Sequence, residues 1–217
     1  MGISELVFNF FNYWFRLPVK EGRVVKRSNW QIWLISVGGR LAFYVSLLHI
    51  LVKDKTSSRN WFDRIDSKVI LGALPFRGMV KDLQELENVT GVVSLNQDYE
   101  LWLFSHNKEG WNKLGIKFLQ LATRDNFEAP SQTNLKSGVD FLLKCWKAEG
   151  TIYVHCKAGK TRSATLVVCY LIEKNNWTPT KAIDHLRKRR VHIFLGDVQL
   201  KAIDTYYENY VKENVMY

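Results

Sequence analysis

A cysteine followed six positions later by an arginine stands between a strand-like run and a helical pattern. The segment reads His155-Cys156-Lys157-Ala158-Gly159-Lys160-Thr161-Arg162-Ser163. Five intervening residues can curl into a loop whose backbone N–H groups point inward and, with the N-terminus of the next helix, bind a phosphate dianion. The same N–H groups favour thiolate over thiol, so they lower the pKa of the cysteine. The spacing therefore predicts a nucleophilic Cys156 beneath a bound phosphate group.

The other residues of this loop have predicted roles that follow from their chemistry. Gly159 can adopt a backbone conformation that a Cβ disfavours. Arg162 offers a planar pair of donors to two phosphate oxygens, and the Ser163 hydroxyl can donate to the sulfur. The predicted phosphate-binding set is Lys157, Ala158, Gly159, Lys160, Thr161 and Arg162. The alternative interpretation is a buried structural cysteine beside a basic turn. An ATP-binding P-loop is excluded because Val154 stands where that motif needs glycine.

An alkoxide leaving group needs a proton, which a carboxylic acid on a neighbouring loop can supply. Residues 123–131 lie between an apolar run and a helical pattern and contain Asp125 and Glu128. We predict Asp125 as the general acid. Glu128 is the local alternative, and a plain turn residue is the other interpretation of Asp125. Since no set of His, Asp or Glu has metal-ligand spacing, we expect neither a metal nor another cofactor.

Apolar runs alternate with helical patterns after residue 60, which is typical of an α/β domain with a mostly parallel central sheet flanked by helices. The predicted strands are 69–71, 92–95, 118–121 and 152–155. The predicted helices are 80–88, 99–114, 131–147, 163–175, 179–190 and 198–212.

Residues 1–52 differ in composition from the rest of the chain. Two apolar blocks, 3–17 and 30–52, surround a basic stretch, and the segment holds six Lys and Arg against two Glu. Arg40, in the middle of the second block, would cost at least ~2.5 kcal/mol at the centre of a bilayer. We therefore predict a targeting or membrane-anchoring leader, with a spanning segment and a packed part of the domain as alternatives. Residues 53–60 are predicted as a linker and 61–217 as the catalytic domain.

The composition limits the class of protein and of partner. The 217 residues suit one domain plus an appendage, and 47% hydrophobic residues exclude disorder as the main state. A net charge of +10 favours an anionic partner. A nucleic acid would leave the Cys–Arg spacing unexplained, but charge alone does not choose between acidic membrane lipid and a phosphorylated substrate. The apolar, basic N-terminus favours lipid, so we expect an anionic phospholipid substrate and membrane association; the sequence does not indicate the oligomeric state. Three cysteines without a Cys-x-x-Cys pair favour a reducing compartment.

Additional basic residues bear on the ligand. Lys157 and Lys160 suit a head group with more than one anionic group, although a solvated basic rim is the alternative. The run 187–190 is predicted to be a helix face or end, with contact to an acidic membrane as the alternative.

The loop 155–163 resembles the signature of the cysteine-dependent protein tyrosine and dual-specificity phosphatases. Trp61-Phe62-Asp63-Arg64-Ile65-Asp66, Leu71-Gly72-Ala73-Leu74-Pro75, Asn96-Gln97-Asp98-Tyr99-Glu100 and Trp111-Asn112-Lys113-Leu114-Gly115 narrow the resemblance to the mitochondrial phosphatidylglycerophosphate phosphatases. Gln97, Glu128 and Lys160-Thr161 depart from that pattern, which has an acid, a glycine and an Arg-Ser pair there.

The resemblance implies an enzyme that dephosphorylates phosphatidylglycerophosphate to phosphatidylglycerol, a cardiolipin precursor, through a phosphocysteine intermediate. It also implies a place at the mitochondrial inner membrane, on the matrix side. A phosphoinositide phosphatase and a dual-specificity protein phosphatase would use the same chemistry. A non-catalytic phosphate-binding scaffold is an alternative of another class.

Overall fold

The protein is described from a computed structural model. This structure describes residues 60–125, 128–146 and 149–212, together with 19–20, 23–24, 43–44 and Leu47. The chain divides into two compact units, Met1–Thr56 and Ser57–Tyr217.

In the first unit, β1 (Val19–Lys20) pairs antiparallel with β2 (Arg23–Val24). Most of the predicted leader and linker lies outside the described residues. Among those residues that are described, no helix is both long enough and apolar enough to cross a bilayer.

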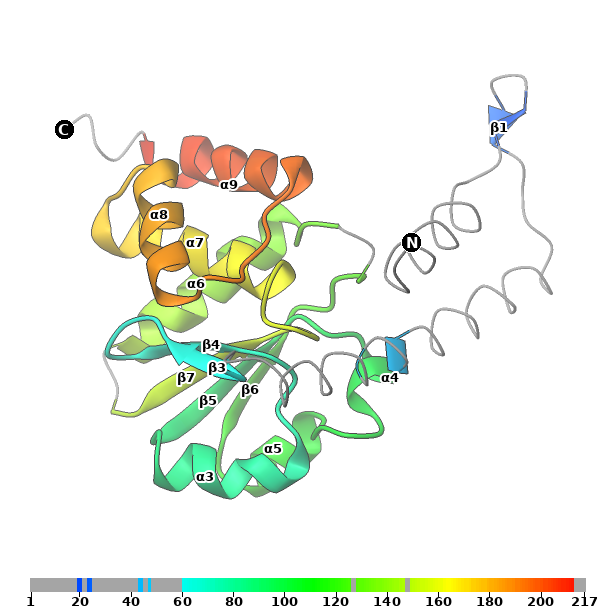
Figure 1. Ribbon diagram of the computed structural model, residues 1–217, viewed down its shortest axis with the longest axis vertical. Coiled ribbons are helices and arrows are strands. Elements are labelled where there is room, and N and C mark those ends of the chain that lie inside the picture. The colour runs from blue at the N-terminus through cyan, green and yellow to red at the C-terminus, as the bar shows by residue number, and fades with distance from the viewer. Residues whose placement is uncertain are drawn as a thin grey trace. The chain divides into compact units, whose positions relative to one another are not determined.

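A five-stranded sheet forms the centre of the second unit, in the order β3-β4-β7-β5-β6 (Figure 1). The strands are β3 (Phe62–Arg64), β4 (Val69–Gly72), β5 (Val89–Ser94), β6 (Lys117–Gln120) and β7 (Thr151–His155). All neighbouring pairs are parallel except β3 with β4, which is antiparallel. The predicted mostly parallel sheet is confirmed. The edge strand β3 was not predicted, because two of its three residues are charged and it contains no apolar run.

Helices cover both faces of the sheet (Figure 1). A short 3-10 helix, η1 (Arg77–Met79), precedes the α-helices. These are α3 (Val80–Glu85), α4 (Asp98–Leu101), α5 (Lys108–Lys113), α6 (Gln132–Trp146), α7 (Arg162–Asn175), α8 (Pro179–Arg189) and α9 (Asp197–Tyr210). Residues of α3 and α5 pack into one hydrophobic cluster, and those of α6 to α9 pack into the other.

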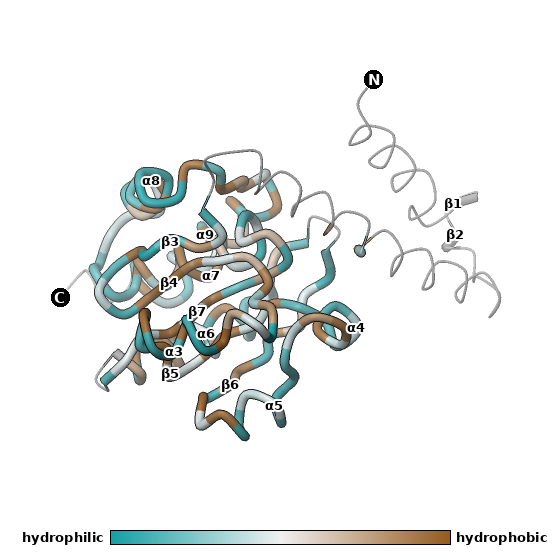
Figure 2. Tube along the Cα trace, turned by 60° about the horizontal axis from the view of Figure 1, so that its bottom comes forward, coloured by the Kyte–Doolittle hydropathy of each residue, from teal (hydrophilic) through white to brown (hydrophobic). Residues whose placement is uncertain are grey.

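The strand sequences explain why both faces are covered. Successive residues of a strand point to opposite faces, so an unbroken apolar strand must be buried on both sides. In β7, Ile152 and Val154 join the cluster under α6 to α9, whereas Tyr153 joins the cluster under α3 and α5. In Figure 2 the hydrophobic colour follows the central strands, while α8 on the outside is mostly hydrophilic. The central strand β7 is therefore fixed from both faces.

The prediction of one helix over 99–114 is wrong, because α4 and α5 are separate. Arg77 hydrogen-bonds to backbone carbonyl groups that would accept helical hydrogen bonds if the helix were continuous. Its guanidinium donates to the carbonyl oxygens of Trp102 and Ser105, both at 3.1 Å. Asn107 then caps the N-terminus of α5. The other five predicted helices are present, with ends that differ by a few residues.

Candidate active site

The segment 156–162, the Cys–Arg loop, joins the carboxyl end of β7 to α7. Every residue of β7 is buried, which fixes the start of the loop. The first eleven residues of α7, from Arg162 to Ile172, are also buried, which fixes its end. The N-terminus of α7 therefore meets the loop, where the helix dipole favours an anion.

Gly159 gives the Cys–Arg loop its tight curvature. Its φ is +64°, in the left-handed region that disfavours a side chain. A Cβ at this position would lie 2.4 Å from the carbonyl oxygen of Gly72 and 2.9 Å from Nη2 of Arg190. Conformation and space both require glycine here.

Cys156 lies at the base of the loop and is 3% exposed. The Ser163 hydroxyl donates to its Sγ at 3.1 Å. Burial by itself raises the pKa of the Cys156 thiol, but the charge of Arg162 and the hydrogen bonds from Ser163 outweigh burial. The pKa therefore lies below its ordinary value. The site favours the thiolate, which is the nucleophilic form.

The neighbouring His155 adds no charge to this environment. It is fully buried, and burial lowers the pKa of its imidazole to about 3. The positive charge beside Cys156 therefore comes from Arg162, since His155 is neutral at physiological pH.

Glu100 holds the guanidinium of Arg162 in one orientation. The two side chains are 0% and 2% exposed, and they form a bidentate pair at 2.9 and 3.1 Å. Arg162 Nη1 also donates to the carbonyl oxygen of Thr123 at 2.8 Å. Within the described part of the chain, the buried Nε of Arg162 has no hydrogen-bond partner. The guanidinium is thus fixed while one donor remains for a ligand oxygen.

Asp125 contacts both the arginine and a lysine of the Cys–Arg loop. Its Oδ1 lies 2.9 Å from Arg162 Nη2, and its Oδ2 forms an ion pair with Lys157. Burial raises the pKa of Asp125, but the charges of Arg162 and Lys157 outweigh burial and hold that pKa below its ordinary value. The alternative acid, Glu128, is exposed to solvent. The geometry therefore favours Asp125 as the carboxyl group that serves the loop.

The sequence matches the family described as "Dual specificity phosphatase, catalytic domain" over residues 78–209. The chain belongs to the dual-specificity phosphatase family. It is 38% identical over 179 residues to the "Phosphatidylglycerophosphatase and protein-tyrosine phosphatase 1" of Mus musculus, a match that covers 81% of this chain and 93% of that protein. It is 39% identical over 174 residues to the "Phosphatidylglycerophosphate phosphatase PTPMT2" of Arabidopsis thaliana, which covers 80% of this chain and 75% of that protein.

A solved structure has the same fold as this dual-specificity phosphatase. The crystal structure of PTPMT1 in complex with PI(5)P matches with a TM-score of 0.69 and 38% identity, covering 72% of this chain and 99% of that one. The resemblance to cysteine-dependent phosphatases and the predicted α/β fold are confirmed.

The structure of this phosphatase brings the predicted site residues together. Ser163 contacts Cys156, and Asp125 contacts both Arg162 and Lys157. Their catalytic roles stay predictions. Sequence reasoning gave no role to Glu100, although it lies in a segment that carries the resemblance. Its position after a buried strand could have drawn attention to this acidic residue. Its partner Arg162 is 62 positions away, so the sequence does not show that the two side chains pair.

The basic run 187–190 of this phosphatase lies at the end of α8, as predicted. Its first three residues are exposed, but Arg190 is 1% exposed and lies behind the Cys–Arg loop. Arg190 Nε donates to the carbonyl oxygen of Gly159 at 2.9 Å, and Nη2 donates to that of Ala158 at 3.3 Å. Nη1 forms an ion pair with Asp63 at 2.6 Å. For Arg190, the alternative of a membrane contact is wrong, because the side chain is buried and its donors support the loop.

We expect Arg190→Lys to lower kcat/KM on a soluble aryl phosphate by roughly tenfold to a hundredfold, because a displaced loop loses its alignment with the substrate. A lysine keeps the charge but cannot donate in a fork to two carbonyl groups. Thermal unfolding should show a loss of roughly 1–3 kcal/mol. Arg189→Lys, at an exposed neighbouring position, is the control. Equal kcat/KM values for the two variants would show that the loop needs no such support.

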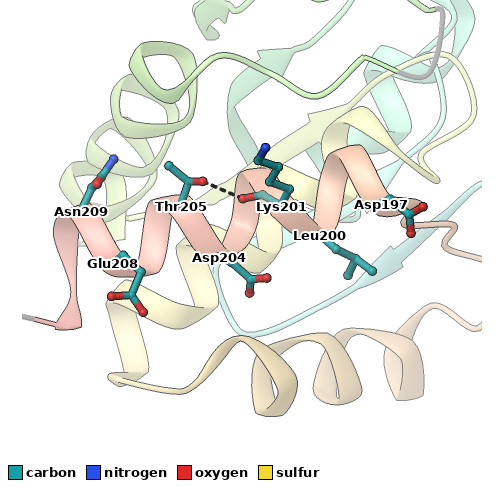
Figure 3. A pocket seen from close by; sticks show the side chains of 7 residues that line it. All are labelled: Asp197, Leu200, Lys201, Asp204, Thr205, Glu208 and Asn209. Atoms are coloured by element: carbon teal, nitrogen blue, oxygen red, sulfur yellow. Dashed lines mark hydrogen bonds between the residues drawn. The ribbon is translucent and has the colours of Figure 1, made fainter.

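Figure 3 shows a separate hollow on α9. It is lined by Asp197, Leu200, Lys201, Asp204, Thr205, Glu208 and Asn209. Three of these residues are acidic and one is basic, so the hollow does not suit an anionic ligand. None of them belongs to the Cys–Arg loop. The phosphate chemistry is therefore still expected at the loop.

Proposed function

We propose that this phosphatase hydrolyses phosphatidylglycerophosphate to phosphatidylglycerol and inorganic phosphate through a phosphocysteine intermediate. The contact of Cys156 with Ser163, together with a guanidinium that Glu100 fixes, is the observation that carries the reaction. The relatives that bear this substrate in their names support the choice of lipid.

In the first step, the Cys156 thiolate attacks phosphorus and the bond to the glycerol oxygen breaks. The N–H groups of the Cys–Arg loop and the Arg162 guanidinium bind the equatorial oxygens, so positioning and electrostatics supply most of the catalysis. The negative charge of the bound phosphate group raises the pKa of Asp125 from its lowered value. Asp125 then carries the proton that it gives to the departing oxygen.

In the second step, water attacks the phosphocysteine and the phosphorus–sulfur bond breaks. Asp125, now a carboxylate, takes a proton from the water. The Ser163 hydroxyl donates to the sulfur and stabilises the departing thiolate. Inorganic phosphate leaves, and the thiolate is regenerated.

A phosphoinositide is the second candidate substrate. The observation that favours it is the solved structure of PTPMT1 in complex with PI(5)P, at 38% identity to this chain. Lys157 and Lys160 in the loop would suit either lipid, because both head groups carry more than one anionic group.

Phosphate release tests the choice. Phosphatidylglycerophosphate, PI(5)P and a phosphotyrosine peptide are assayed side by side at equal concentration. We expect the highest kcat/KM for phosphatidylglycerophosphate. A higher value for PI(5)P or for the peptide would replace the proposed substrate, and no release from any of them would favour a phosphate-binding scaffold.

We further propose that residues 1–52 deliver the enzyme to the matrix side of the mitochondrial inner membrane and anchor it there. The support is compositional: two apolar blocks surround a basic stretch, which suits an interface with anionic lipid.

A truncated protein that begins at Ser57 is expected to fold and to turn over a short-chain soluble substrate with a kcat near that of the full chain. The carbonyl oxygens of Asn60 and Trp61 accept from Arg190, so the truncation must precede residue 60. On anionic vesicles its activity should be lower, because the apolar and basic leader is missing. An insoluble product, or one inactive on the soluble substrate, would place the leader in the core of the catalytic unit.

A further inference from the structure

Large apolar side chains exposed to solvent gather at one edge of the sheet. Six of the eight in the described residues lie in two short segments, 102–104 and 191–198. The first apolar rim is Trp102, Leu103 and Phe104; the second apolar rim is Val191, Phe194 and Val198. The other two, Leu86 and Leu114, precede β5 and β6 and so lie at the opposite edge.

Each rim includes or adjoins a residue that contacts the Cys–Arg loop. The first follows α4, whose Glu100 pairs with Arg162. The second is joined directly, since the backbone N–H of Phe194 donates to the carbonyl oxygen of Lys160 at 2.9 Å. The rims therefore border the loop from two different elements.

The burial of the Cys156 nucleophile suggests a role for these rims. Cys156 is only 3% exposed, so a phosphate group must enter the loop completely to reach it. A lipid monoester with a short head group can do so only if the protein around the loop comes down to the bilayer surface. Trp102 is 73% exposed and Phe194 is 57% exposed, and aromatic side chains of this kind are favoured at membrane interfaces.

We propose that the two apolar rims enter the interfacial layer of a phospholipid bilayer and seat the Cys–Arg loop on it. This docking surface belongs to the catalytic unit and acts in addition to any leader; it rests on the proposed phospholipid phosphatase function. Exposed charges beside the rims have both signs, with basic residues in excess: Arg77, Arg124, Arg187, Lys188 and Arg189 against Asp98 and Asp197. The rims supply apolar contact with any phospholipid, and the excess of basic side chains adds attraction to anionic lipid.

A kinetic comparison of full-length variants tests the proposal. Trp102→Ala/Phe194→Ala removes one aromatic residue from each rim, and Leu86→Ala/Leu114→Ala is the matched control at the opposite edge. On phosphatidylcholine vesicles that contain phosphatidylglycerophosphate, we expect the rim variant to lose roughly tenfold or more in kcat/KM. The control variant should match the wild type. Both should keep wild-type kcat/KM on a short-chain soluble form of the lipid, which also shows that they fold.

Two further measurements identify the mode of contact. Vesicles with brominated acyl chains should quench part of the tryptophan fluorescence of the wild type. In Trp102→Phe this quenching should be absent, while the activity on vesicles stays at the wild-type level. The loss in the rim variant should persist at high salt, because screening weakens charge contacts and not apolar ones.

Equal vesicle kinetics for the rim and control variants would overturn the inference while the proposed function stands. Self-association that the rim variant loses, with unchanged vesicle kinetics, would overturn it in favour of a protein interface. Failure of the wild type to hydrolyse the soluble lipid would instead overturn the proposed function.

Discussion

Cys156→Ser is expected to abolish turnover while the protein still binds a phosphate analogue. A serine hydroxyl in this loop is a far weaker nucleophile than the thiolate that Arg162 and Ser163 stabilise. The backbone N–H groups and the guanidinium that hold the anion are unchanged. Phosphate release measures the first effect, and calorimetric titration with tungstate measures the second.

Cys145→Ser is the control for this experiment, because Cys145 is a half-buried thiol on α6 and lies outside the Cys–Arg loop. Its activity should equal that of the wild type. If Cys156→Ser kept more than a tenth of the wild-type kcat, the nucleophile would be another group, since a serine cannot supply that rate here.

Asp125→Asn is expected to slow the release of an alkyl alcohol by about 10²–10⁴-fold and to slow the release of an acidic phenol much less. An alkoxide needs a proton as the ester bond breaks, whereas a stabilised phenolate does not. The measurement compares kcat for a short-chain glycerophosphate lipid with kcat for an aryl phosphate. The basic limb of the rate profile, where Asp125 loses the proton that it must donate, should disappear in Asp125→Asn.

Glu128→Gln provides the control, because that carboxylate is exposed and three residues away. It should leave both rates near wild type. Equal losses on the alkyl and aryl substrates in Asp125→Asn would remove the acid role from Asp125, and a large loss in Glu128→Gln would give that role to Glu128.

The Cys–Arg loop was predictable because its determinants are local. Cys156, Gly159 and Arg162 lie within seven consecutive residues, and the apolar strand and helix that hold them adjoin the same segment. Asp125 could be placed because a loop after one parallel strand lies at the same edge of the sheet as a loop after another.

The supports of the loop were not predictable from the sequence. Arg190 meets Gly159 across 31 positions, and Glu100 meets Arg162 across 62. Neither spacing has a local periodicity, so each side chain resembles any charged residue of a helix. Arg77 likewise divides the predicted helix 99–114 from 25 and 28 positions away. Such contacts depend on which strands become neighbours, which a single sequence does not specify.

Because Asp125 forms ion pairs with Arg162 and Lys157, its carboxylate competes with a bound anion for these two cations. An anion that binds Arg162 Nη2 and Lys157 must first displace the Asp125 carboxylate, so breaking those ion pairs offsets part of its binding free energy. Protonation removes this competitor. Sulfate should therefore bind more tightly as pH falls toward the pKa of Asp125. The returning carboxylate would also help to expel phosphate at the end of each cycle.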